Sequence, residues 1–179
     1  LFVPVALAPH DLEQLVHGFF FFLLRVERHG VVEARLMVVR VLLQARLLLE
    51  GEAAERGAAR MDAAGVKAMT SLCRRMDKAL GQGDAQGYLA ANEDFHVMLY
   101  KAAGSPLLFE LIDTLWLKAG PISNQLFDAP EAPAVLNDAH ADLIKSLARH
   151  DSAGVRRAVE KDIFVAGRFL RRRIKASPR

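Results

Sequence analysis

Four polar side chains recur in an otherwise apolar, helical stretch of sequence, at spacings that would bring them to one point. They are Asn92, His96, His140 and Asp162. Two imidazoles and one carboxylate suit zinc, nickel, manganese or iron, and the carbonyl oxygen of an asparagine can add a neutral fourth donor. These residues therefore predict a divalent-metal site with positions left open for water or for the oxygens of a ligand.

The convergence of these residues depends on helices. Asn92 and His96 are four residues apart, so on a helix they project from one face, one turn apart. His140 lies ten residues before an expected turn at 150–151, and Asp162 lies eleven residues after it. At about 1.5 Å per residue, roughly 15 Å up one helix and 16 Å back along the next return the chain to the same level. The two side chains can therefore face each other.

The same residues also have an ordinary structural explanation. Two histidines on apolar helix faces can be hydrogen-bonded core residues, with Asp162 orienting one of them. Spacing alone leaves the metal site and the filled core as competing interpretations.

A single guanidinium stands among leucines, because Arg46 is flanked by leucines at 42, 43 and 47–49. A cation in these surroundings needs an anion. Glu50, four residues on, would make an ordinary surface ion pair along one helix face. A ligand carboxylate held by both arms of the guanidinium is the alternative partner.

These residues must be positioned by helices, because the apolar pattern predicts helices and almost no strands. Spacings of i, i+3 and i+4 recur throughout, while strand-like alternation is almost absent. We expect an all-α fold, an antiparallel bundle of six or seven helices. The expected helices span 11–28, 31–49 with a continuation over 52–60, 62–80, 84–104, 106–120, and a final hairpin that turns at 150–151.

Glycine, proline and aspartate set the expected boundaries. Gly30 should end the first helix, Gly51 should interrupt the second, and Asp62 should cap the third. Residues 121–133 contain three prolines and little periodicity, so this longest loop is a candidate lid over a pocket.

Length and composition favour one globular domain, because 179 residues with 52% hydrophobic side chains can build a core without structural staples. The only cysteine, Cys73, cannot form an internal disulfide, and no secretion signal is visible, so we expect a cytoplasmic setting. The apolar run over 19–24 is far short of the ~20 residues that a membrane helix needs, and it should face a partner surface.

The charge distribution gives little support for nucleic acid. The formal net charge is only +3, although six cations crowd residues 168–179. These cations fit a helix end that meets the negative pole of the macrodipole, and a phosphate-contacting tail is the alternative.

Three stretches together resemble the C-terminal effector-binding domain of the GntR family of bacterial transcription regulators, in its FadR-like branch. The first is 45–60, which opens with Ala-Arg-Leu-Leu-Leu-Glu. The second is 92–106, with Asn-Glu-Asp-Phe-His followed by Ala-Ala-Gly-Ser-Pro. The third runs from His140-Ala-Asp-Leu-Ile to Asp162-Ile163, and the likeness as a whole covers about residues 34–174. The Phe-His pair with its Ala-Ala-Gly turn, and the 22-residue interval from His140 to Asp162, are specific in combination.

The resemblance implies that a central cavity of the bundle holds a divalent metal and a small carboxylate effector. His96 and His140 match the family's ligands, and Arg46 matches its effector-binding arginine. The family usually has aspartate at the first ligand position and histidine at the last, where this chain has Asn92 and Asp162. The set still contains two imidazoles and one carboxylate, with the carboxylate moved to another helix.

Regulators of this kind also carry an N-terminal winged helix-turn-helix, whose last strand often ends in Phe-Val. Leu1-Phe2-Val3 resembles that tail, and the chain opens without an initiator methionine, as a fragment would. We therefore expect a linker remnant over 1–10, a helical effector-binding domain over 11–174 and a tail over 175–179. Operator DNA would be read by a domain outside this chain.

The leading hypothesis is the effector-sensing domain of a homodimeric regulator, which binds a small carboxylate, performs no catalysis and has no membrane partner. A helical-bundle metalloenzyme is the first rival, but only Glu93 and His96 have the Glu-x-x-His spacing, and Glu93 and Asp94 are nominal candidates for a general base. A purely structural dimerisation domain with a filled core is the second.

Overall fold

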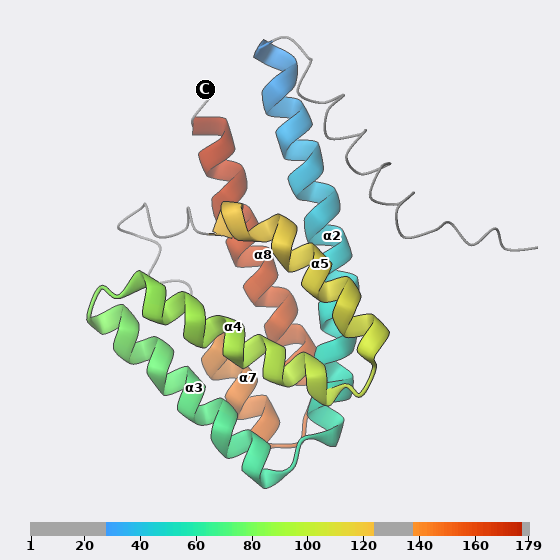
Figure 1. Ribbon diagram of the computed structural model, residues 1–179, viewed down its shortest axis with the longest axis vertical. Coiled ribbons are helices and arrows are strands. Elements are labelled where there is room, and N and C mark those ends of the chain that lie inside the picture. The colour runs from blue at the N-terminus through green and yellow to red at the C-terminus, as the bar shows by residue number, and fades with distance from the viewer. Residues whose placement is uncertain (1–27, 124–137, 177–179) are drawn as a thin grey trace, which may run out of the picture.

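A computed structural model describes residues 28–123 and 138–176, and all structural statements below concern these ranges. They form six helices and contain no strand, so the all-α prediction is confirmed (Figure 1). The expected helix over 11–28, the apolar run over 19–24 and most of the expected lid lie outside these ranges. The helices are α2 (Arg28–Arg60), α3 (Ala63–Gly81), α4 (Ala85–Ala102), α5 (Pro106–Ser123), α7 (Asp138–Ala148) and α8 (Ser152–Ala176).

Aspartate side chains begin three of the helices. Asp62 accepts a 2.8 Å hydrogen bond from the backbone N–H of Gly65, which confirms the predicted cap of α3. Asp84 caps α4 and Asp151 caps α8 in the same way, through bonds of 2.8 and 2.7 Å to backbone N–H groups three residues on. Each carboxylate satisfies an N–H that the helix itself leaves free.

The predicted breaks at Gly30 and Gly51 are wrong, because α2 runs without interruption through both glycines. Gly51 is buried where α8 crosses α2, and an added Cβ would come within 3.0 Å of the Glu160 carboxylate. A glycine inside a helix costs about 1 kcal/mol relative to alanine. Here the missing side chain leaves room for the Glu160 and Arg156 side chains of α8.

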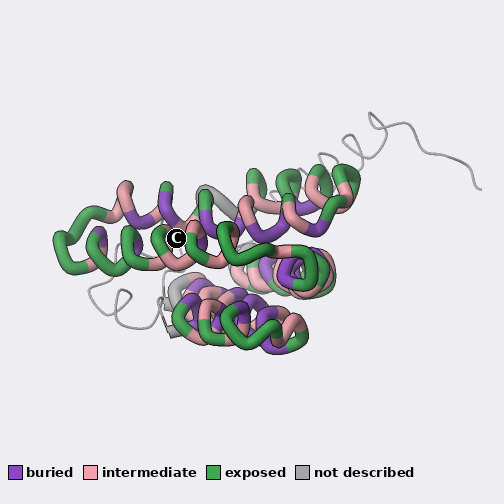
Figure 2. Tube along the Cα trace, turned by 90° about the horizontal axis from the view of Figure 1, so that it is seen from below, coloured by how far each residue is buried: buried purple, intermediate pink, exposed green. Residues whose placement is uncertain are grey.

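Two long helices and a helical hairpin form the frame. In Figure 1, α2 and α8 run side by side, and α3 and α4 form a hairpin that crosses their lower part. The short α7 packs on α8 and α3, while α5 lies across α2. Figure 2 shows buried positions where the helices face one another and exposed positions on their outer sides. The core therefore lies between the hairpin and the α2–α8 pair.

The crossing of α2 over α4 is unusually close. An added Cβ on the buried Gly57 of α2 would overlap the backbone carbonyl of Leu99 on α4. This contact sets which turn of α4 packs on which turn of α2, and it brings Tyr100 of α4 beside Glu50 of α2.

No helix in the described ranges is both long enough and apolar enough to cross a membrane. Ion pairs join side chains on the outer faces of the helices. Arg156 of α8 takes part in three of them. This guanidinium contacts Glu52 and Glu55 on α2 and Glu160 on its own helix at 2.9 to 3.3 Å. It links the two long helices at the surface.

Candidate metal and ligand site

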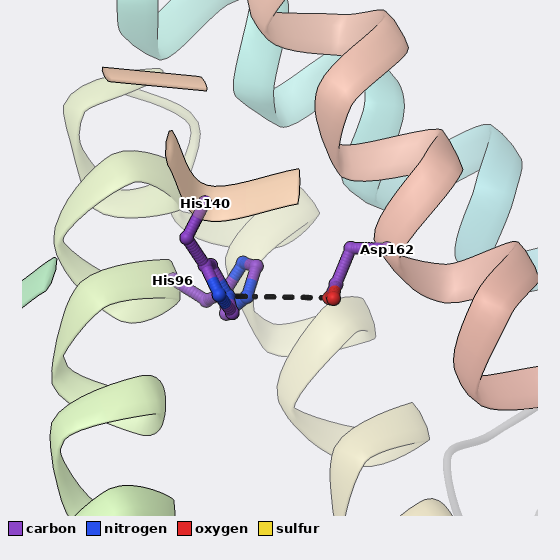
Figure 3. A group of neighbouring side chains, drawn as sticks. All are labelled: His96, His140 and Asp162. Atoms are coloured by element: carbon purple, nitrogen blue, oxygen red, sulfur yellow. Dashed lines mark hydrogen bonds and ion pairs between the residues drawn. The ribbon is translucent and has the colours of Figure 1, made fainter. Parts of the chain in front are cut away.

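Three of the four predicted metal ligands meet inside the bundle, each from a different helix. His96 comes from α4, His140 from α7 and Asp162 from α8, and Figure 3 shows their polar ends directed at one another. The two Nε2 atoms are 3.2 Å apart, and His96 Nε2 lies 3.6 Å from Asp162 Oδ2. Both imidazoles are buried and Asp162 is partly buried. We call these three residues the triad.

Asn92 lies one turn before His96 on α4 and is partly buried. Its helical position agrees with the predicted shared face. Its role as a ligand stays a prediction.

Phe95 holds the two imidazoles in place. This fully buried ring meets the rings of His96 and His140 edge-on, with centroids 5.5 and 5.1 Å away. An aromatic ring packed in this way restricts how far either imidazole can turn.

A buried hydrogen-bonded chain supports His96 from behind. The Tyr100 hydroxyl donates to Glu50 Oε2 at 2.8 Å and lies 3.1 Å from His96 Nδ1. Because the hydroxyl gives its proton to Glu50, its oxygen can accept the Nδ1–H of His96. The lone pair of His96 Nε2 is then left facing His140 and Asp162, which is the tautomer that a metal ligand needs.

Arg46 completes this chain. Its guanidinium binds both oxygens of Glu50, through Nε at 2.5 Å and Nη2 at 3.3 Å. Glu50, one of the two partners considered for Arg46, is therefore present, but the surface setting expected for this pair is wrong, since Glu50 is 0% exposed. A ligand carboxylate as a second partner stays a prediction. We call Arg46, Glu50, Tyr100 and His96 the relay.

Burial controls the charges in the site. Desolvation, followed by the nearby His140 and Arg46, lowers the pKa of His96 well below its ordinary value, so its ring is neutral. Burial and the Glu50 carboxylate raise the pKa of Tyr100, which stays a hydrogen-bond donor. Desolvation raises the pKa of Asp162, while His140 and Arg46 act against that rise.

The triad has the dimensions of a metal site. Two ligand atoms bound to one ion at about 2.0 to 2.2 Å, at tetrahedral or octahedral angles, are about 2.8 to 3.6 Å apart. The separations of His96 from His140 and from Asp162, 3.2 and 3.6 Å, fall in this range, and all three ligand atoms lie within 4.8 Å of one another. The donor set and the two separations that involve His96 fit a divalent ion.

Two aromatic residues that the sequence analysis did not select border this region. The Trp116 ring of α5 lies 5.7 Å from the His96 ring and 6.3 Å from the Tyr100 ring, and the Arg46 guanidinium lies 5.7 Å from its centroid. Tyr100 and Trp116 also line a cavity of about 240 Å³ between α4 and α5. Tyr100 had a visible signal, since it continues the four-residue spacing from Asn92 and His96. Trp116 had none.

Solved structures share this fold. E. coli McbR/YncC superposes with a TM-score of 0.68 at 22% sequence identity, over 75% of this chain and 68% of that one. Streptococcus agalactiae GntR superposes with a TM-score of 0.60 at 25% identity, over 75% of this chain and 58% of that one. The arrangement of helices is therefore one that other proteins of known structure adopt.

Sequence comparison adds a relative and a family. The E. coli HTH-type transcriptional regulator McbR is 28% identical over 92 residues, which are 49% of this chain and 41% of McbR. The model of the FCD domain matches residues 41–163, which is more than half of the chain and includes the relay and the triad. The chain belongs to the FCD domain family of GntR-type transcription regulators.

Proposed function

We propose that this chain senses a small carboxylate effector for a DNA-binding regulator, and that a divalent metal held by the triad takes part in binding. The single observation that carries the proposal is the convergence of His96, His140 and Asp162 from three helices, with ligand atoms within 4.8 Å of one another. The relay supports it, because it orients His96 with its Nε2 lone pair toward the other two residues.

The triad would hold the ion, and Asn92 would add a neutral carbonyl oxygen from the same face of α4. When bound, such an ion supplies a Lewis-acidic positive charge that attracts carboxylate oxygens. The neutral state of His96 suits this role, because an imidazole must be deprotonated at the atom that binds metal.

Arg46 is proposed to recognise the effector carboxylate. Glu50 occupies two of its five N–H groups and holds the guanidinium rigidly against the Trp116 ring. The remaining N–H groups can meet a second carboxylate, and the fixed geometry lowers the entropy lost on binding.

An effector bound in this way would connect several helices. The triad and Arg46 come from α2, α4, α7 and α8, so ligand contacts would tighten the hairpin against the long pair. Binding can change the affinity for DNA only if one arrangement of the protein binds effector better than another. A difference of about 1 to 3 kcal/mol in the free energy of effector binding between the two arrangements changes the affinity for DNA roughly 5- to 150-fold.

We also propose the domain organisation, the oligomeric state, the location and the DNA partner of the whole protein. They are a linker remnant over residues 1–10, an effector domain over 11–174, a tail over 175–179, a homodimer in the cytoplasm, and operator DNA bound by a domain outside this chain. The family is one of regulator domains and not of enzymes.

Isothermal titration tests the proposed function. Small mono- and dicarboxylic acids are titrated into chelator-treated protein and into protein loaded with zinc or nickel. We expect at least one acid to bind the loaded protein more tightly, and Arg46→Met to weaken that binding while leaving metal affinity intact. A purely structural domain would bind none of the acids in either state, and that result would reject the proposal.

A further inference from the structure

We propose that the half-open cavity between α4 and α5 binds a small organic cation, with an ammonium or guanidinium group on an apolar body the size of a single ring. Its walls come from α4 and α5, whereas the triad joins α4, α7 and α8. This site does not depend on the proposed metal and carboxylate function.

The cavity lies where α4 and α5 diverge from a shared corner. Gly104, at a φ of 68°, and Pro106 turn the chain there, and α5 then packs mainly across α2 and little against α4 (Figure 1). One face of each helix lines the space that is left, with positions that follow the helical period. They are Glu93, Val97 and Tyr100 on α4, and Phe109, Ile112, Asp113, Trp116 and Leu117 on α5.

Two carboxylates on these walls lack a cation. Glu93 and Asp113 are exposed, and neither makes an ion pair within the described part of the chain. By contrast, the exposed Asp142 contacts both Lys145 and Lys161. Because Glu93 and Asp113 border one cavity from two helices, their negative potentials add inside it. This charge favours a cationic occupant and disfavours an anion.

Two protein cations contact aromatic walls of the cavity. The Arg46 guanidinium lies 5.7 Å from the centroid of the Trp116 ring, but it is paired with Glu50. Lys101 Nζ lies 5.1 Å from the centroid of the Phe109 ring. Both rings therefore already make the kind of contact with positive charge that an organic cation would use.

The carboxylates are set back from the corner. At about 1.5 Å per residue, Glu93 lies roughly 14 Å before the end of α4, and Asp113 lies roughly 10 Å after the start of α5. Phe109 and its Lys101 neighbour lie next to the corner. We therefore place the head group of the occupant between the two carboxylates, and its apolar body toward the corner.

The volume and apolar lining define the body of the occupant. The cavity measures about 240 Å³, and an apolar cavity of about 150 Å³ is large enough for benzene, so one ring with a short arm fits. Val97, Ile112 and Leu117 supply aliphatic surface. Leu117 is 74% exposed, and an occupant that covers it removes apolar surface from water, which favours binding.

The test compares phenethylammonium with its neutral isostere, phenethyl alcohol, on chelator-treated protein at low ionic strength. Trp116 is the only tryptophan in the sequence and lines the cavity, so its fluorescence reports occupancy. We expect phenethylammonium to change the emission saturably and to bind about tenfold more tightly than the alcohol. Salt at about 1 M should reduce this preference to about twofold, because it screens the exposed carboxylates.

Three variants with substitutions of exposed side chains complete the experiment, with calorimetry as the readout. Glu93→Gln and Asp113→Asn should each weaken phenethylammonium about threefold and leave phenethyl alcohol unchanged, because each removes a charge and little volume. Combined, they should bring the two affinities within about twofold of each other. Glu110→Gln, which changes an exposed acid of α5 outside the cavity wall, is the matched control and should bind both probes as the wild type does.

Three results would overturn the proposal. They are the absence of saturable binding by phenethylammonium, equal affinities of the wild type for the two probes, and an undiminished preference for the ammonium when both Glu93 and Asp113 are substituted.

Discussion

Tyr100 donates a 2.8 Å hydrogen bond to Glu50, whose carboxylate is buried at 0% exposure. The same hydroxyl oxygen is within 3.1 Å of His96 Nδ1, so one tyrosine joins a buried acid to a candidate metal ligand. The buried Glu50 carboxylate has hydrogen-bond partners in the Tyr100 hydroxyl and the Arg46 guanidinium. The same hydroxyl fixes the tautomer of His96, so that Nε2, on the other side of the ring, is available to bind a metal ion.

Removing the Tyr100 hydroxyl should therefore harm both stability and metal binding. For Tyr100→Phe we expect the free energy of unfolding to fall by about 1 to 3 kcal/mol, because among the described residues Glu50 then keeps only Arg46 as a hydrogen-bond partner. We expect zinc affinity to fall about 10- to 100-fold, because His96 loses its orienting bond. Urea unfolding and calorimetry measure the two effects.

The matched control is Thr114→Val, which removes an exposed hydroxyl that bonds only within its own helix. It should change stability by no more than about 0.5 kcal/mol. Unchanged zinc affinity in Tyr100→Phe would show that the relay does not orient His96.

Arg46 and Glu50 should be strongly coupled. Arg46→Met leaves a buried carboxylate without its counter-charge, and Glu50→Gln leaves the guanidinium, 13% exposed, without one. Each single substitution should cost about 3 kcal/mol, and the double substitution should cost clearly less than their sum. A double-mutant cycle by urea unfolding measures the coupling, and additive costs would mean that the pair is not an energetic unit.

Two glycines should respond in opposite directions to alanine. Gly57→Ala forces a Cβ into the Leu99 carbonyl where α2 crosses α4, and should destabilise the fold by at least ~2 kcal/mol. Gly81 has open space around it near the end of α3, so Gly81→Ala should be neutral or stabilise by up to about 1 kcal/mol. Equal effects in thermal unfolding would contradict the close crossing that positions Tyr100.

The low pKa of His96 predicts acid sensitivity of the metal-free protein. The folded state holds this pKa below its ordinary value of 6.5, so the unfolded state binds more protons between the two values. Stability must then rise with pH across this window and be lost as pH falls below about 6.5. Asp162, whose folded pKa is raised above 3.8, contributes with the opposite sign at lower pH.

Unfolding in urea between pH 7.5 and 5, with chelator present, measures this slope. His96→Gln should flatten it. His150→Asn, an exposed control at a positive-φ position that asparagine tolerates, should keep the wild-type slope. A steep slope in His96→Gln would assign the acid sensitivity to another group.

The fold was largely predictable from local signals. Helical spacing and the Asp62 cap predicted helices that the structure contains. The helix breaks predicted at Gly30 and Gly51 are wrong for one reason: they rest only on the low helix propensity of glycine. A buried glycine inside a helix looks the same in sequence as a helix stop, and only the contact of Gly51 with side chains of α8 separates them.

The candidate site was predictable where residues share a helix or a hairpin. His140 and Asp162 reach the same level because the α7–α8 hairpin turns between them, and Asn92 and His96 share one face of α4. The contacts of Tyr100 with Glu50 and of Trp116 with His96 join α4 to α2 and α5. No periodicity encodes which turn of one helix meets which turn of another, so the burial of Glu50 could not be anticipated.

The central claim is that the triad binds a divalent metal, and titration of zinc into tag-free, chelator-treated protein tests it most directly. We predict one ion per chain for the wild type and for His150→Asn, and at least a 100-fold loss of affinity in His96→Ala, His140→Ala and Asp162→Ala. Failure of the folded wild type to bind zinc, nickel, manganese or iron, or unchanged affinity in the triad variants, would contradict the account.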